Sequence, residues 1–154
     1  MARTSPRTAV ATLEGNPRLA AGTDERFTGY GVMGVPFATG HYLALRVMLA
    51  SSVGPGYRAV WHRAPDGRWT IFTTNPPDLS CPRYFGAAAT SERVPQIEVG
   101  WPDERTVLVE MDDRVSWRVE LAGTGATRML SAMGGAMPDG AWDSPAVLDG
   151  MSPM

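Results

Sequence analysis

One histidine, His62, lies in the middle of a segment whose alternating pattern predicts a β-strand. Imidazole is the side chain that most readily gives and takes protons near neutral pH. Arg58 lies four residues earlier, and the two-residue period of a strand puts both side chains on one face of the sheet. If that face lines a cavity, His62 and Arg58 are candidate catalytic residues for proton transfer or charge stabilisation. If it faces water, both are solvated surface residues.

A second group of residues is suited to holding an apolar molecule. Aromatic walls with a few polar anchors are typical of small-molecule sites. The candidate ligand-binding residues are Arg46, Trp61, Trp69, Phe72, Tyr84 and Trp117. Core packing is the first explanation for the tryptophans, because they alternate onto the faces of strands that are expected to point inward, and a cavity wall is the rival. These tryptophans are Trp61, Trp69, Trp101 and Trp117.

Other chemistries find less support in the sequence. Cys81 is the only cysteine and lies in an irregular segment, where a small buried thiol is the simpler expectation than a nucleophile. With two histidines and one cysteine far apart in the sequence, no metal site is predicted, and no cofactor either. The string Gly29 to Gly34 matches the dinucleotide-binding pattern by letter, but it lacks the flanking strand and helix that such a site needs. All basic residues are arginine, which removes lysine-based mechanisms.

Composition limits the partners and the location. The formal net charge is −2 and no basic run occurs, so nucleic acid is not an expected partner. No stretch approaches the roughly 20 apolar residues of a membrane-spanning helix, and no signal-peptide core is found. A lone cysteine and the lack of a leader predict a cytoplasmic protein that does not bind membranes.

The elements that must position these residues are mostly strands. Residues 1–26 have no period and predict a flexible N-terminal arm with little regular structure, followed by a single β-domain over residues 27–154. Residues 27–40 predict a loop or a broken strand, and residues 42–49 a central strand. Ala64 to Gly67 predicts the turn of a hairpin with strands 57–63 and 68–73, in which Trp61 faces Ile71.

The second half of the chain predicts a meander. Residues 74–95 read as a long loop. Residues 96–101, 105–111 and 114–121 alternate so cleanly that one apolar and one solvated face are expected. Residues 126–132 predict either one more strand or the start of a helix, and residues 144–150 a short C-terminal helix.

The residue order also resembles a known group of proteins. The strings GYGVMGVPFATG, VWHRAPDGRWTIFTTNPP and SCPRYFG, followed by a meander, resemble uncharacterised actinobacterial proteins similar in strand spacing to the N-terminal half of the lipocalin-like group that includes carotenoid hydratases. The resemblance covers about residues 27–150, and its most specific part is the hairpin from Trp61 to Trp69. It implies an antiparallel sheet curved around an apolar interior, and it carries over no catalytic residue. Since such relatives continue further, it also suggests a C-terminally shortened domain.

The predicted fold is therefore mainly β, an antiparallel lipocalin-like barrel or half-barrel of about six to seven strands with a short C-terminal helix. The leading functional hypothesis is binding of a small apolar or amphipathic molecule in a barrel-like cavity. One alternative is a cofactor-independent cyclase, isomerase or hydratase that uses His62 and an arginine. Another is a half-domain completed by self-association, for example as a homodimer, because its sheet edges need cover.

Overall fold

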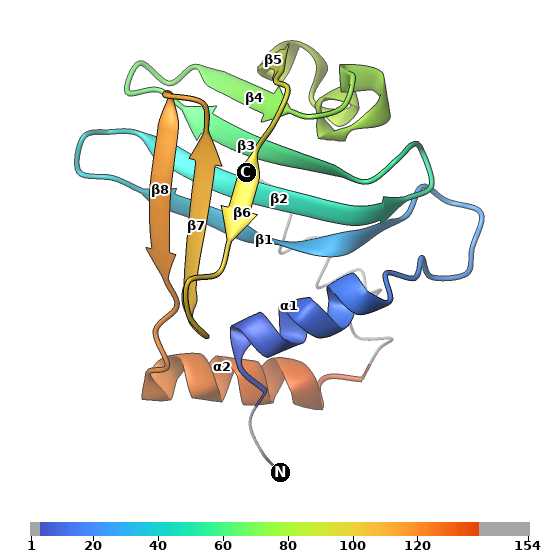
Figure 1. The fold of residues 1–154 in the computed structure, drawn as a ribbon, viewed down its shortest axis with the longest axis vertical. Coiled ribbons are helices and arrows are strands. Elements are labelled where there is room, and N and C mark those ends of the chain that lie inside the picture. Colours follow the sequence, from blue (N-terminus) through green and yellow to red (C-terminus); the bar gives the residue numbers. More distant parts are fainter. Residues whose placement is uncertain (1–3, 139–154) are drawn as a thin grey trace. The chain divides into compact units, whose positions relative to one another are not determined.

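The computed structural model describes residues 4–138. Its chain divides into two compact units, residues 1–120 and residues 121–154, and each is described separately here. Figure 1 shows that the first unit is built from two β-sheets and one helix.

The larger sheet of the first unit has five strands that follow one another in chain order. They are β1 (Phe27–Pro36), β2 (Tyr42–Ser51), β3 (Tyr57–Arg63), β4 (Trp69–Thr73) and β5 (Thr90–Arg93). Neighbouring strands are antiparallel except for β4 and β5, which run parallel. The prediction of a central strand after residue 41 is confirmed.

The smaller sheet is the meander that the alternation predicted. Its antiparallel strands are β6 (Glu98–Gly100), β7 (Thr106–Met111) and β8 (Val115–Glu120). Figure 1 shows this sheet crossing one face of the larger one. Within residues 4–138 the two sheets remain separate and close into no hydrogen-bonded barrel. The mainly β, antiparallel class is thus confirmed, whereas the barrel is not.

The β3–β4 hairpin forms as its sequence predicted. Trp61 is paired with Ile71. The turn is closed by two hydrogen bonds, from the Gly67 N–H to the Ala64 carbonyl and from the Ala64 N–H to the Arg68 carbonyl, both 2.9 Å. Gly67 has a φ of 89°, which side chains disfavour, so the glycine is required at this place.

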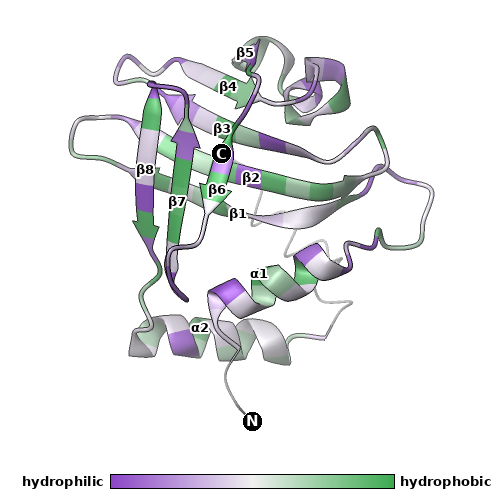
Figure 2. Ribbon diagram, viewed as in Figure 1, coloured by the Kyte–Doolittle hydropathy of each residue, from purple (hydrophilic) through white to green (hydrophobic). Residues whose placement is uncertain are grey.

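Both faces of the larger sheet are covered, and this gives the unit two apolar layers. One layer lies between the sheets, where Leu45, Val60 and Val109 are fully buried. The other lies on the opposite face, where Ile71 and Cys81 pack with neighbours from the segment that follows β4. Figure 2 shows hydrophobic residues concentrated along β2 and β7. The face of the meander that was predicted to be apolar is largely buried. Thr106 differs from the prediction, because it lies on the face that was expected to be solvated and is buried.

Strand β1 is long although it contains three glycines and ends at Pro36. Its pairing with β2 shifts register twice, between Thr28 and Gly29 and between Val32 and Val35. A Cβ atom at Gly29 would lie 2.0 Å from the Val47 carbonyl oxygen, so a side chain at this place would push the strands apart. The broken strand predicted for residues 27–40 is therefore confirmed as a strand with two irregularities.

Two segments predicted as irregular contain regular structure. Residues 1–26 include helix α1 (Pro6–Gly15), so the prediction of little regular structure there was wrong. Ser5 is its N-cap, and the Arg7 guanidinium donates to the Trp101 carbonyl at 2.7 Å, which joins the helix to the meander. The predicted loop after β4 contains three short 3₁₀ helices and β5.

The second unit contains helix α2 (Gly125–Ala136), capped by Thr124, whose hydroxyl accepts from the Thr127 N–H at 3.2 Å. The ambiguous residues 126–132 therefore form a helix, as one of the two predictions had it. The helix predicted for residues 144–150 lies outside the described residues. Neither described helix is long and apolar enough to cross a membrane.

Candidate functional site

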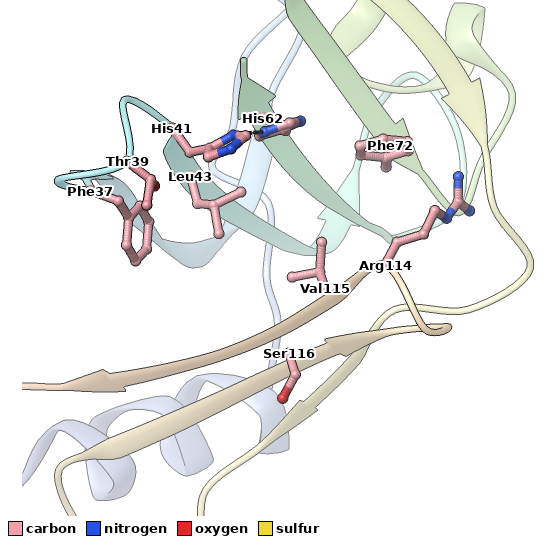
Figure 3. A pocket seen from close by; sticks show the side chains of 9 residues that line it. All are labelled: Phe37, Thr39, His41, Leu43, His62, Phe72, Arg114, Val115 and Ser116. Carbon is pink, nitrogen blue, oxygen red and sulfur yellow. Dashed lines mark hydrogen bonds between the residues drawn. The ribbon is translucent and has the colours of Figure 1, made fainter. Parts of the chain in front are cut away.

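A cleft of about 490 Å³ opens between the two sheets at the end where the β1–β2 and β7–β8 turns lie. Figure 3 shows the side chains that line it. They are Phe37, Thr39, His41, Leu43, His62, Phe72, Arg114, Val115 and Ser116. Aromatic and aliphatic side chains form most of this wall, and two imidazoles and one guanidinium supply its charged or titratable groups.

The β1–β2 turn brings His41 to the cleft. The Phe37 N–H donates to the His41 carbonyl at 2.8 Å, and the Gly40 N–H donates to the Phe37 carbonyl at 2.9 Å. Gly40 has a φ of 84°, and a Cβ there would come within 3.2 Å of Pro65 in the neighbouring turn. This tight turn places His41 directly before β2, and β2 pairs with β3 so that Leu43 lies opposite His62.

The two imidazoles share a hydrogen bond. His41 Nδ1 and His62 Nε2 are 2.8 Å apart, and the ring planes differ by only 22° (Figure 3). Because each nitrogen lies about 1 Å from its ring centre, a centroid separation of 5.0 Å requires the rings to meet end to end. Such a bond needs one N–H and one bare nitrogen, so two neutral rings hold two protons, one of which lies in the bond between them.

His62 is half-buried, and this environment favours its neutral form. Burial lowers the pKa of His62 below its ordinary value of 6.5, and the nearby charge of His41 lowers this pKa further. Among residues 4–138, no carboxylate lines the cleft to hold either ring as an imidazolium. At neutral pH His62 is therefore a base and a hydrogen-bonding group rather than a cation.

We expect the folded protein to lose stability as the pH falls from about 6.5 through the lowered pKa of His62. The folded state binds fewer protons than the unfolded state in this window, so acidification favours unfolding, and the contribution is fully present above pH 6.5. Urea unfolding at pH 7.5 and in steps down to pH 5 measures the slope. His62→Gln should flatten it, and an unchanged slope in this variant would contradict the assignment.

Arg114 closes the other end of the cleft but its charge is already neutralised. Its guanidinium contacts Glu92 at 2.6 Å and Asp112 at 2.9 Å, and it lies over the Phe72 ring at 5.0 Å. The hydrogen bonds that the guanidinium donates to these two carboxylates raise the pKa of Arg114. With one cation between two anions, this end of the cleft has no surplus positive charge for an anionic ligand.

The sequence-predicted site residues divide among several places. His62 and Phe72 line the cleft, and Trp117 packs against its Phe37 wall with ring centroids 6.4 Å apart. Arg58 lies at another hollow, of about 420 Å³, where its guanidinium donates to the Ile97 carbonyl at 2.7 Å. Arg58 and His62 are four positions apart on the same strand, which places them about 13 Å from each other along it. The pair proposed for catalysis is therefore on one face but does not meet.

The remaining candidates lie away from the cleft. Arg46 donates to the Val32 and Leu45 carbonyls and lies 5.5 Å from the centre of the Trp61 ring. Trp61 and Trp69 make an edge contact on this face, with centroids 6.4 Å apart. Because residues on one strand alternate between faces, Trp61 and the cleft residue His62 point to opposite sides of the larger sheet.

Tyr84 is also remote from the imidazole pair. Its hydroxyl donates to Glu25, which also pairs with Arg83 at 2.6 Å, and its ring packs edge-on against Phe27. Cys81 is buried, and burial raises the pKa of its thiol, as expected for a packing residue. Among the described residues, no three His, Cys, Asp or Glu side chains gather in a way that would hold a metal ion.

Sequence reasoning missed the partner of His62. His41 counted only as one of two histidines far apart in the sequence, although the strand that His41 directly precedes and the strand that carries His62 are adjacent in the chain. Antiparallel pairing of these strands, combined with the hairpin register, was the signal that brings residues 41 and 62 together. Arg114 had no such signal, because it reaches the cleft only through the packing of the two sheets.

Comparison with protein-family models, with curated proteins and with solved structures finds no match to this chain. The resemblance to the lipocalin-like group therefore stays a prediction, and functional inference rests on the cleft.

Proposed function

We propose that this protein binds a small, neutral, amphipathic molecule in the cleft between its two sheets. The observation that carries the proposal is the pairing of an apolar wall with a hydrogen-bonded imidazole pair at one end. A volume of about 490 Å³ falls within the roughly 300–1,000 Å³ of small-molecule sites. The apolar part of a ligand would contact Phe37, Leu43 and Phe72, and its polar end would hydrogen-bond to an imidazole.

The charges of the cleft support a neutral ligand. Arg114 is paired with two carboxylates, so an anion would meet no free cation there. Burial disfavours the charged form of His62, so this imidazole offers a hydrogen bond rather than a full charge. A cytoplasmic location and a homodimer remain proposals from the sequence.

Filling the cleft should abolish this binding. N-phenyl-1-naphthylamine, a neutral apolar fluorophore, is expected to brighten on binding to the unaltered protein. Val115→Trp places a large ring in the cleft, and we expect it to weaken binding at least about tenfold. Losing about 60 Å² of apolar contact already costs about 1.4 kcal/mol.

Met33→Trp provides the matched control, because Met33 is 80% exposed on β1 and lines no part of this cleft. Binding to this variant should equal that of the unaltered protein. Equal binding by all three proteins, or no binding by the unaltered one, would contradict the proposal. Mass spectrometry of small molecules that co-purify with the native protein would then identify the natural ligand class.

A further inference from the structure

The end-to-end histidine pair connects two hollows of the first unit. His41 lines the cleft, whereas His62 lines both the cleft and a second hollow of about 430 Å³ bordered by Trp69, Thr70 and Thr90. We propose that His41 and His62 form a proton relay, which takes a proton from a molecule bound in the cleft and exchanges it with solvent through the second hollow. This inference rests on the proposed binding function and adds an activity to it.

The hydrogen-bond geometry suits a relay. Since His41 Nδ1 and His62 Nε2 bond to each other, His41 Nε2 and His62 Nδ1 are the two ends of the pair. A proton accepted at His41 Nε2 allows the Nδ1 proton of His41 to move to His62 Nε2. The Nδ1 proton of His62 then leaves to water. Each ring ends as the other neutral tautomer, and the reverse passage restores the pair.

The charged groups around the pair leave both rings free to act as bases. Arg114 from the β7–β8 turn faces the cleft already bound to Glu92 and Asp112. Arg68 from the β3–β4 turn borders the second hollow and pairs with Asp66 at 2.8 Å. Among the described residues no carboxylate forms a hydrogen bond or ion pair with either histidine, so none stabilises the imidazolium form. Burial of His62 acts in the same direction, toward neutral imidazole at pH 7.

The apolar wall of the cleft fits a neutral molecule with an apolar body, and the base beside it would act on such a molecule if it is a carbon acid, for example a ketone. The base removes a proton from the carbon next to the carbonyl, and the electrons of that C–H bond form a carbon–carbon double bond. The carbonyl π electrons move to oxygen. Return of a proton from the relay to a different atom completes an isomerisation that needs no oxidant, reductant or metal.

The proton-transfer step can be measured with a neutral aromatic probe, 5-nitrobenzisoxazole. A base takes its C3 proton, the electrons of that bond form the nitrile, and the N–O bond breaks to give 2-cyano-4-nitrophenolate, which is followed by absorbance. We expect the full chain to accelerate this reaction about 10²–10⁴-fold over the same concentration of free imidazole at equal pH. The rate of the unaltered protein should fall as the pH is lowered below about 6.5.

Two variants separate a relay from a single base. His41→Gln removes the ring that meets the substrate. His62→Gln keeps a hydrogen-bonding group beside His41 but cannot pass a proton onward, so both should lose at least about tenfold in kcat/KM. Arg63→Gln is the matched control, since this exposed neighbour of His62 alternates onto the opposite face and should retain full activity. Loss of activity in His41→Gln alone would overturn the relay in favour of a lone base.

A reference ligand distinguishes failure of the relay from failure of the proposed binding function. The unreactive analogue 5-nitroindazole has the size and shape of the probe, and its binding is measured by calorimetry. Binding without turnover, or a rate independent of pH between 5 and 8 in the unaltered protein, would overturn the relay and leave the binding function standing. Absence of both binding and turnover would overturn the two together. The pH profile needs no variant, so it holds even if a substitution disturbs folding.

Discussion

Replacing Ile97 by alanine is expected to lower the free energy of unfolding by about 2–5 kcal/mol. Ile97 is 0% exposed and lies just before β6, at the contact between the two sheets. Truncating its side chain removes apolar contacts and leaves a cavity that a close-packed interior fills only in part. Its carbonyl also accepts the hydrogen bond from Arg58, so loosening this place weakens a second link between the sheets.

Urea unfolding followed by tryptophan fluorescence measures the Ile97→Ala effect. Met33→Ala is the control, because Met33 is largely exposed and its truncation should change the free energy of unfolding by no more than about 0.5 kcal/mol. Similar losses in both variants would show that the inter-sheet layer is not the main source of stability. The Arg58→Met variant would then test the hydrogen bond alone.

Trp61→Ala should cost about 3 kcal/mol of stability and leave the cleft intact. The Trp61 ring contacts Phe85 with centroids 4.5 Å apart and lies under the Arg46 guanidinium, so it attaches the segment after β4 to the outer face of the larger sheet. Trp61→Phe should recover much of the loss, because it keeps an aromatic ring at this place. Thermal unfolding monitored by circular dichroism provides the measurement.

The same variant decides between two candidate sites. The sequence suggested Trp61 and Trp69 as ligand-binding residues, whereas the cleft lies on the other face of the sheet. We expect folded Trp61→Ala to bind N-phenyl-1-naphthylamine as tightly as the unaltered protein at a temperature where both are native. A loss of binding in the folded variant would move the site to the aromatic face.

Local patterns predicted most of the sheets. The turn from Ala64 to Gly67 is specified by proline and glycine chemistry, and once it is placed, the register of Trp61 with Ile71 follows by counting. The meander was equally readable, because one of its faces is apolar and the other largely solvated, and strand periodicity is strongest in that case.

The faces of the hairpin were harder to assign. Sequence reasoning favoured core packing for the Trp61 face, with a ligand-binding wall as the rival, and left the His62 face undecided between a cavity and water. Both faces are in fact covered, one by the second sheet and the other by the segment after β4, so neither has a solvated pattern. Periodicity identifies which residues share a face, but what packs on that face depends on contacts distant in sequence.

Two elements were missed for different reasons. Strand β5 has four exposed residues and pairs in parallel with β4, so it has no apolar pattern to detect. Helix α1 has no buried residue, but Ser5 and Pro6 form a recognisable start, because a serine N-cap followed by proline is typical of a helix N-terminus. The amphipathic pattern of α1 is too weak to predict the helix, whereas its capping residues could have predicted where it begins.

The two register shifts of β1 have a consequence for how this protein meets other chains. β1 is an edge of the larger sheet, where unpaired backbone groups offer a template for a further strand and hence for aggregation. Between the two register shifts, β1 pairs regularly with β2 only from Gly29 to Val32. Beyond the second shift the strand ends at Pro36. At the opposite edge, β5 is short and carries Glu92 and Arg93. Both edges of the larger sheet therefore have features that hinder the addition of a further strand. Any self-association is expected to use contacts between side chains rather than backbone hydrogen bonds.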